Sequence, residues 1–351
     1  MTTKFIGYIG TYTNGESEGV YSFTFDAAAA KITDIKAAAH LANPTYVNIS
    51  QDNHYLYAVL KEDDQGGVAS FSVNEDTGEL TPINKQLLNG SSPCHVSVDS
   101  NRKFLFSANY HKGTVESYHL DSNTGSITPP VSSIKHEGSG PDPRQEKAHT
   151  HFAGVTPDKK YLAVVELGID CLITYEISED GVLLEVGRLP LKAGSGPRHL
   201  TFHPHKNTAY IMTEFSSEVI VLNYHPENGH FTEKQYISTL PDDFKENNQG
   251  SAIHISSDGR FIYAGNRGHN SIAIFFVNEE SGELNFVDRV SSEGDWPRDF
   301  SLDPTERFLV GSNQESNNLV LYTRDSETGR LHLLQSDIKV PNPVCVKFLS
   351  Y

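Results

Sequence analysis

The chain has 351 residues, a formal net charge of −17 and three cysteines. A negative charge of this size argues against nucleic acid and anionic membrane surfaces as partners. The cysteines (Cys94, Cys171 and Cys345) are odd in number and widely spaced, so we expect no disulfide framework, metal site or redox centre. No apolar run approaches the length of a membrane span, and the N-terminus lacks the apolar core of a signal peptide. Together these features predict a cytoplasmic protein without membrane contact.

The first forty residues contain three predicted strands, at 4–12, 20–25 and 32–38, which are rich in β-branched and aromatic residues. They match the second, third and fourth strands of a unit that recurs later in the chain. The first strand of this N-terminal unit is missing. We expect residues 344–348, near the C-terminus, to supply it.

From residue 43 onward the sequence repeats with a period of roughly fifty residues. Each copy opens with an apolar alternation and continues through a polar hairpin into a strand that begins with an aromatic residue. A third strand ends on an aromatic residue, and a glycine-centred turn such as Thr124-Gly125 or Thr328-Gly329 precedes the fourth. The first strands begin at these anchor positions: Pro44, Pro93, Thr150, Pro197, Gly250, Pro297 and Pro343.

Four strands at this period predict an all-β fold, a seven-bladed β-propeller of four-stranded blades. We expect a single domain over residues 1–351, with the C-terminal strand pairing with the N-terminal blade to close the ring. Closure of this kind leaves few exposed strand edges. The predicted blades are 342–351 with 4–40, 41–90, 91–145, 146–194, 195–247, 248–294 and 295–341.

The strand order places two sets of polar residues on one rim of the predicted channel. Strands alternate in direction, so the starts of first strands and the ends of second strands lie on one face. The other face carries hairpins of ordinary turn residues. The rim residues are His149, His151, Arg198, His199 and Arg298 at first strands, and Glu166, Glu214, Asn266, Arg267 and Gln314 at the ends of second strands. An acidic chain that collects arginines on one concave rim is suited to holding a small anion.

One connection, residues 136–147, is longer than its counterparts and rich in glycine and proline. It joins a fourth strand to the next first strand, so it lies on the same face as the rim, where long loops often bind ligands. It carries Arg144 and Gln145, which we expect beside His149 and His151. No third ligand accompanies the two histidines, so no metal site is predicted.

Arg198, Glu214 and Arg267 form the strongest group. A single histidine or asparagine in a propeller channel is more often a satisfied structural group than a ligand. Two arginines and a carboxylate from adjacent blades are costly to desolvate, which favours an anion site; the alternative is a structural ion-pair cluster. We expect all three at a solvent-filled mouth, where replacing any one of them leaves the fold intact.

A series of motifs resembles the seven-bladed propeller lactonase family over essentially the whole chain. The motifs are Arg144-Gln145 followed by His149-x-His151, Gly194-x-Gly-Pro-Arg-His199, Ser256-x-Asp-Gly-Arg-Phe-Ile-Tyr-x-Gly-Asn-Arg267 and Trp296-Pro-Arg-Asp-Phe300. Members of this family include the propeller-type 6-phosphogluconolactonase and the fungal carboxy-cis,cis-muconate lactonizing enzyme. The resemblance implies an enzyme without a cofactor that opens or closes a sugar-acid or muconate lactone.

The resemblance also implies which residues form the site. The family's proposed groups are a histidine, two arginines and a glutamate, which fall on the His149-x-His151 motif, Arg198, Arg267 and Glu214. We expect Glu214 or one of the two histidines to act as general base on water, and Arg198 or Arg267 to stabilise the oxyanion. The other candidates are assigned to substrate binding: Arg144, Gln145, His199, Glu166, Asn266, Arg298 and Gln314.

The first predicted function is hydrolysis of 6-phospho-D-glucono-1,5-lactone to 6-phosphogluconate, within the pentose phosphate pathway of carbohydrate metabolism. The partner would be the small anionic lactone, and the protein a monomer or weak homo-oligomer. One alternative is a carboxymuconate-type lactonizing cycloisomerase on the same framework, and another is a non-catalytic propeller that binds partners. Unusual residues concentrate at the channel mouth and not in surface aromatic patches, which favours an enzyme.

Overall fold

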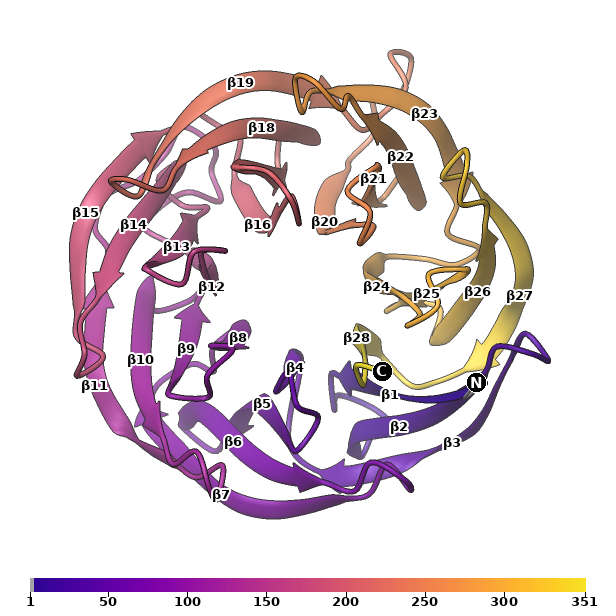
Figure 1. The fold of residues 1–351 in the computed structure, drawn as a ribbon, viewed down its shortest axis with the longest axis horizontal. Helices are drawn as coiled ribbons and strands as arrows, with labels where there is room; N and C mark the ends of the chain where they lie inside the picture. Colours follow the sequence, from indigo (N-terminus) through magenta and orange to yellow (C-terminus); the bar gives the residue numbers. More distant parts are fainter. Residues whose placement is uncertain (1–2) are drawn as a thin grey trace.

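The computed structural model describes residues 3–351, which form 28 strands in seven antiparallel sheets of four strands each. Figure 1 shows the sheets arranged as blades in a ring, with the innermost strands around a central axis. No helix within residues 3–351 is long and apolar enough to cross a membrane. The predicted fold class, an all-β seven-bladed propeller, is confirmed.

We number the blades one to seven along the chain and give the strands of each from the channel outward. Blade one contains β28 (Pro343–Phe348), β1 (Lys4–Thr11), β2 (Gly19–Asp26) and β3 (Lys31–His40); blade two β4 (Val47–Ile49), β5 (Tyr55–Glu62), β6 (Gln65–Val73) and β7 (Leu80–Asn89); blade three β8 (His95–Val98), β9 (Phe104–Asn109), β10 (Thr114–Leu120) and β11 (Ile127–Lys135); blade four β12 (Thr150–Val155), β13 (Tyr161–Glu166), β14 (Cys171–Ile177) and β15 (Leu183–Pro190); blade five β16 (Pro197–Phe202), β17 (Thr208–Thr213), β18 (Glu218–His225) and β19 (His230–Ser238); blade six β20 (Gln249–Ile255), β21 (Phe261–Arg267), β22 (Ser271–Val277) and β23 (Leu284–Ser291); and blade seven β24 (Pro297–Leu302), β25 (Phe308–Asn313), β26 (Asn318–Arg324) and β27 (Leu331–Lys339).

The hydrophobic core lies between neighbouring blades. Every residue of β9 is buried, because its sheet packs against another sheet on each face, whereas the outermost strand β11 is mostly exposed. Phe106 of β9, for example, belongs to one cluster with Leu162 and Val164 of the next blade. Apolar burial on both faces of the second and third strands therefore holds adjacent blades together.

A tyrosine at the third position of the second strand, distinct from an aromatic residue that begins such a strand, is linked in the structure to the glycine turn before a fourth strand. The hydroxyl of Tyr210 donates to the carbonyl of Gly282 at 2.9 Å, and that of Tyr263 donates to Gly329 at 2.8 Å. In both cases the tyrosine belongs to one blade and the glycine to the next. The repeated glycine turn thus connects consecutive blades, and a buried tyrosine hydroxyl gains the partner that it needs.

The C-terminal strand closes the ring as predicted. β28 pairs antiparallel with β1, with Ile9 opposite Val346. Figure 1 shows β28 as the innermost strand of the blade that contains β1, β2 and β3. Beyond the strand, Ser350 N donates to Asn53 Oδ1 at 2.8 Å, which ties the end of the chain to blade two.

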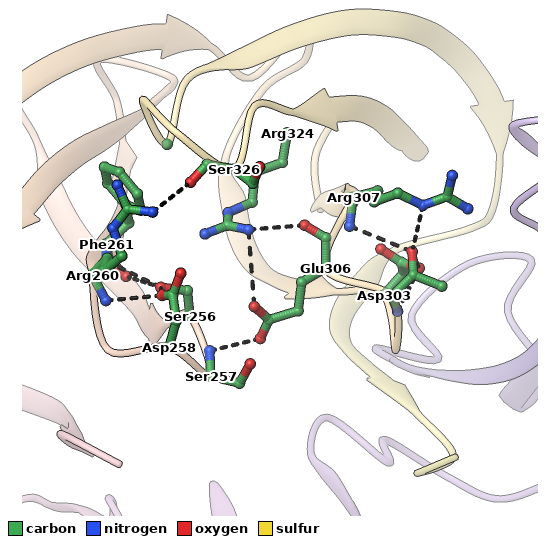
Figure 2. A network of polar contacts seen from close by, with 12 residues as sticks. Ser256, Ser257, Asp258, Arg260, Phe261, Asp303, Glu306, Arg307, Arg324 and Ser326 are labelled. Atoms are coloured by element: carbon green, nitrogen blue, oxygen red, sulfur yellow. Dashed lines mark hydrogen bonds and ion pairs between the residues drawn. The ribbon is translucent and has the colours of Figure 1, made fainter. Parts of the chain in front are cut away.

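The face that carries the hairpins between first and second strands is held by polar contacts between blades six and seven (Figure 2). Ser257 N donates to Glu306 Oε1 at 2.7 Å, and Arg324 Nη1 donates to the Glu306 carbonyl at 3.0 Å. Arg260 Nη1 donates to the carbonyl of Ser326 at 3.3 Å. The contacts of Ser257 and Arg260 join blade six to blade seven, and that of Arg324 with Glu306 lies within blade seven. The predicted site residues lie on the other face.

Candidate active site

Three of the predicted site residues are bulge residues at the starts of innermost strands. In blade five the pairing skips Arg198, which lies between residues paired with Thr213 and Met212. β12 skips His151 and β24 skips Arg298 in the same way. A bulge re-aims the extra side chain out of the regular alternation of the strand. All three side chains line a cavity at the channel mouth or the recess beneath it.

The cavity has a volume of about 250 Å³, and an adjoining recess of about 40 Å³ shares part of its lining. The charged groups of the cavity are Glu214, Arg267 and Arg298. The recess adds Arg198 and Asp299. Blades five, six and seven therefore supply all the charged groups, and they face one small space.

Glu214 holds two arginines through a single carboxylate oxygen. Its Oε2 accepts a hydrogen bond from Arg198 Nε at 3.1 Å and another from Arg267 Nη2 at 2.7 Å. The guanidiniums also donate to backbone carbonyls of blade six: Arg198 to Ser251 at 2.9 Å and Arg267 to Gly250 at 2.7 Å. The structure thus brings together the three groups that strand topology predicts on one rim.

These three groups are more buried than the sequence suggested. Exposed fractions are 3% for Arg198, 8% for Glu214 and 3% for Arg267. The expectation of a solvent-filled mouth is wrong, because blade-six carbonyls and the Trp296 ring, 5.5 Å from the Arg267 guanidinium, cover the charges. The related expectation, that replacing any one of them leaves the fold intact, therefore loses its basis.

The cluster keeps its charges at neutral pH. Burial alone would raise the pKa of Glu214, but Arg267 and Arg198 outweigh that effect and the pKa is lowered. Burial, with the nearby Arg267, lowers the pKa of Arg198 to about 9, which still leaves it cationic at pH 7. The charged Glu214 carboxylate therefore holds two charged guanidiniums in fixed positions, in which they can bind an anion.

The two histidines of the His149-x-His151 motif have different surroundings. Both nitrogens of His149 face oxygens, Nδ1 the Tyr110 carbonyl at 2.9 Å and Nε2 the Glu146 carboxylate at 3.1 Å, and the ring stacks on Tyr110. His151 lines the cavity, and its buried Nδ1 has no hydrogen-bond partner. Burial, then Arg198 and Arg298, hold the pKa of His151 well below its usual range, so its imidazole is neutral. His151 is the histidine available to a ligand.

Aromatic rings and imidazoles form the floor of the site. His199 lines the recess, and its ring lies 5.1 Å from that of His151 and 5.8 Å from that of Tyr46. His95 packs between Tyr46 and Phe152, with ring centroids 4.4 Å and 4.5 Å away. The pKa of His199 is lowered well below its usual range by burial, then by Arg198, so this floor carries no added charge. The imidazoles therefore add no positive charge to the recess, whose charged lining groups are Arg198, Arg298 and Asp299.

Arg298 differs from the other two arginines in its partners. Its Nη1 donates to Gln314 Oε1 at 3.1 Å, and its guanidinium lies 5.3 Å from the Tyr12 ring. Within residues 3–351 it has no carboxylate oxygen within 4.0 Å. The side chain is partly exposed and lines both cavity and recess. The predicted pair Arg298 and Gln314 thus stands at the entrance of the site.

The loop residues Arg144 and Gln145 do not line the cavity. Arg144 pairs with Asp142 at 3.1 Å and lies over the Phe215 ring at 3.8 Å. Gln145 is buried; its Nε2 donates to the Leu167 carbonyl at 2.7 Å. Both side chains fix the long connection to blades four and five.

Glu166 and Asn266 also lie outside the cavity lining. Glu166 accepts from Thr150 Oγ1 at 3.4 Å and from Ile169 N at 3.1 Å, and burial raises its pKa to about 8. Asn266 Oδ1 accepts from Thr239 Oγ1 at 2.7 Å. Glu166 thus satisfies groups of its own blade, whereas Asn266, in blade six, binds a residue that follows the last strand of blade five.

Several cavity residues were not among the predicted ones: Tyr12, Cys94 and Tyr110. A signal for Cys94 was present, because it follows anchor Pro93 as His151, Arg198 and Arg298 follow theirs. Tyr12 and Tyr110 follow directly on the second strands of their blades. Applying both positional rules, the residue after the anchor and the residue after the second strand, to all seven copies would have included these residues.

A larger groove, of about 560 Å³, lies elsewhere on the surface, between residues 14–16 and 339–342. Its charged groups are Glu16 and Lys339, and the remaining lining residues are asparagines, a glycine, a valine and a proline. The smaller cavity and its recess are lined by more positively charged side chains than this groove, so we assign the active site to the smaller cavity. Among residues 3–351, no group of three or more His, Cys, Asp or Glu side chains is placed to hold a metal ion.

Comparisons with known proteins agree on one family. The model of the family described as lactonase, 7-bladed beta-propeller, matches residues 6–348. A 6-phosphogluconolactonase of Bacillus subtilis (strain 168) is 56% identical over 347 residues, covering 99% of each chain. A crystal structure of a protein from Lactobacillus plantarum matches with a TM-score of 0.95 at 41% identity, over 99% of this chain and 100% of that one. The structure of a periplasmic gluconolactonase of Pseudomonas aeruginosa matches with a TM-score of 0.94 at 32% identity, over 99% of both chains.

Proposed function

Because the chain belongs to the seven-bladed β-propeller lactonase family, we propose that it hydrolyses 6-phospho-D-glucono-1,5-lactone to 6-phosphogluconate. The Bacillus subtilis relative, at 56% identity over nearly its whole length, carries the name of this activity. Such a reaction places the protein in the pentose phosphate pathway, and we propose a cytoplasmic location to match.

The observation that carries the proposal is the charge of the site. Three guanidiniums and the two carboxylates Glu214 and Asp299 line the cavity and its recess, and Asp299 is compensated by Lys347, a residue outside the lining, at 3.3 Å. Two positive charges remain uncompensated. A phosphate monoester carries a charge of about −1.5 to −2 at pH 7. The substrate phosphate therefore neutralises the site, and an uncharged lactone leaves it unbalanced.

His151 is the group we assign as general base. Its imidazole is neutral, lines the cavity and offers a buried nitrogen without a partner. Apart from burial, the neighbouring arginines lower its pKa, so the arrival of an anionic substrate offsets part of that effect and makes the imidazole more basic. His151 then takes a proton from the water that attacks the lactone carbonyl carbon.

Arg198 and Arg267 are assigned to the oxygen that becomes negative when water adds. Glu214 fixes both guanidiniums through Oε2, and the blade-six carbonyls fix them further. Donors held in place in a buried site stabilise developing charge without reorganisation at the moment of reaction. Collapse of the adduct breaks the bond to the ring oxygen, which takes up a proton to give the open hydroxy acid.

The test is a comparison of two lactones. Purified protein receives 6-phospho-D-glucono-1,5-lactone or unphosphorylated D-glucono-1,5-lactone at pH 7, acid release is followed, and the spontaneous rate is subtracted. We expect kcat/KM to be roughly 30-fold or more higher for the phosphorylated lactone, since charge-assisted contacts contribute about 2 kcal/mol. Rates equal to the spontaneous rate for both lactones would overturn the proposal.

A further inference from the structure

We infer that Arg298, held by Gln314 and Tyr12, is the specificity-determining residue that binds the substrate phosphate, whereas Arg198 and Arg267 act at the lactone. This inference rests on the proposed function and assigns the phosphate to one side of the site. Its first basis is electrostatic. Arg198 and Arg267 share the Glu214 carboxylate, so much of their charge is already neutralised.

Arg298 is the lining guanidinium that lacks a carboxylate partner in the part of the chain that the structure describes. Its hydrogen-bond partner is a neutral amide, Gln314 Oε1, at 3.1 Å. The same amide donates through Nε2 to Glu315 Oε1 at 2.7 Å, so its oxygen is oriented toward Arg298. A guanidinium held by an amide keeps its full charge and its remaining N–H groups for a dianion.

The position of Arg298 suits a terminal phosphate. It is partly exposed, whereas Arg198 and Arg267 are each 3% exposed. A phosphate has a strongly bound hydration shell, so a site nearer to solvent costs less to fill than one beside the buried Glu214. The reacting carbonyl, in contrast, gains from the enclosed arginines.

The backbone before Arg298 supports a built site. Trp296 has φ of 64°, in the left-handed region that a bulky residue rarely adopts. Two contacts hold it there: its N–H donates to Asn270 Oδ1 at 3.0 Å, and its carbonyl accepts from Gln314 N at 3.1 Å. The Trp296 ring then lies against Arg267, and the next residues lead into the bulge at Arg298. Strained backbone is often found at ligand sites. Here the strained residue Trp296 places its own ring against Arg267 and leads the chain into the bulge that positions Arg298.

The experiment compares two variants with wild type on both lactones. Arg298→Gln removes the charge. Gln314→Glu leaves Arg298 in place but sets a carboxylate beside it, in a nearly isosteric change that tests the same idea if the first variant folds poorly. We expect each variant to lose roughly 30-fold in kcat/KM for the phosphorylated lactone and less than about 3-fold for the unphosphorylated one. Arg307→Ala, on the opposite face (Figure 2), should change neither.

A second measurement does not depend on turnover. Calorimetric binding of 6-phosphogluconate should weaken roughly 30-fold in both variants, and binding of gluconate should change little. If wild type prefers the phosphorylated lactone and the variants keep that preference, the assignment of Arg298 is wrong while the proposed function stands. If wild type hydrolyses neither lactone, the proposed function itself fails.

Discussion

His151 and Arg198 occupy the same position in successive blades: each is the single residue that the pairing of an innermost strand with its neighbour leaves out. The bulge turns both side chains to the channel mouth, where His151 is neutral and Arg198 is cationic at pH 7. One repeated backbone feature thus delivers a proton acceptor from one blade and an anion-binding group from the next. The predictions below test the groups that this arrangement brings together.

We expect Glu214→Gln to destabilise the protein as well as to inactivate it. The variant leaves Arg198 and Arg267 buried without their shared countercharge, which costs about 3–5 kcal/mol for a buried pair. Urea unfolding of wild type and variant at pH 7 measures the difference. Glu146→Gln is the control, since Glu146 is exposed and faces a single histidine, and its free energy of unfolding should change by less than about 1 kcal/mol. An unchanged midpoint for Glu214→Gln would show that the cluster contributes nothing to the fold.

The two histidines of the motif should differ in their effect on turnover. His151→Gln removes the proposed general base, and kcat should fall by roughly 100-fold to 10,000-fold, as for other general bases. His149→Gln removes a ring that does not itself line the cavity and whose nitrogens face the Tyr110 carbonyl and Glu146, and kcat should fall by less than about 3-fold. Steady-state kinetics on the phosphorylated lactone compare the pair. The assignment is reversed if His149→Gln proves the more damaging change.

Glu166→Gln should stabilise the protein progressively as the pH rises. The folded state holds the proton of Glu166 until about pH 8, whereas the unfolded chain releases it near pH 4.3, so the unfolded state gains relative stability between these values. The glutamine oxygen can accept from Ile169 N as Glu166 does, and its amide N–H can donate to Thr150 Oγ1 once that hydroxyl rotates. We expect the variant to match wild type near pH 4.5 and to exceed it by about 2–5 kcal/mol at pH 8.5. Parallel denaturation curves at both pH values measure this, and a difference independent of pH would contradict a buried protonated carboxyl.

Cys94 should resist alkylation even though it lines the cavity. Burial raises the pKa of its thiol to about 12, so only about one molecule in 10,000 carries the reactive thiolate at pH 8. Iodoacetamide followed by peptide mass spectrometry should show no label on native protein, and full labelling after unfolding in urea provides the control. Rapid labelling of native Cys94 would indicate a more polar, more open cavity.

The sequence by itself determined the ring. A period of about fifty residues, with an aromatic-led second strand and a glycine turn, predicted seven blades and closure by the last strand. The structure shows what the predicted glycine turns do: Gly282 and Gly329 accept hydrogen bonds from Tyr210 and Tyr263 of the preceding blades, so this repeat in sequence is also a repeat of contacts. Local patterns of this kind can be recognised in the sequence without knowing which distant residues they contact.

The sequence predicted only part of the site. Strand direction placed Arg198, Glu214 and Arg267 on one rim, but it could not distinguish His149 from His151, because alternation gives both the same face. The bulge in β12 separates them, and a bulge depends on how two strands pair. Burial likewise depends on neighbouring blades, which enclose Glu214 between two guanidiniums that lie 16 and 53 residues away in the chain. The tertiary structure alone therefore decided that Arg198 and Arg267 are paired with Glu214, and that Arg298 is left without a carboxylate partner among the residues that the structure describes.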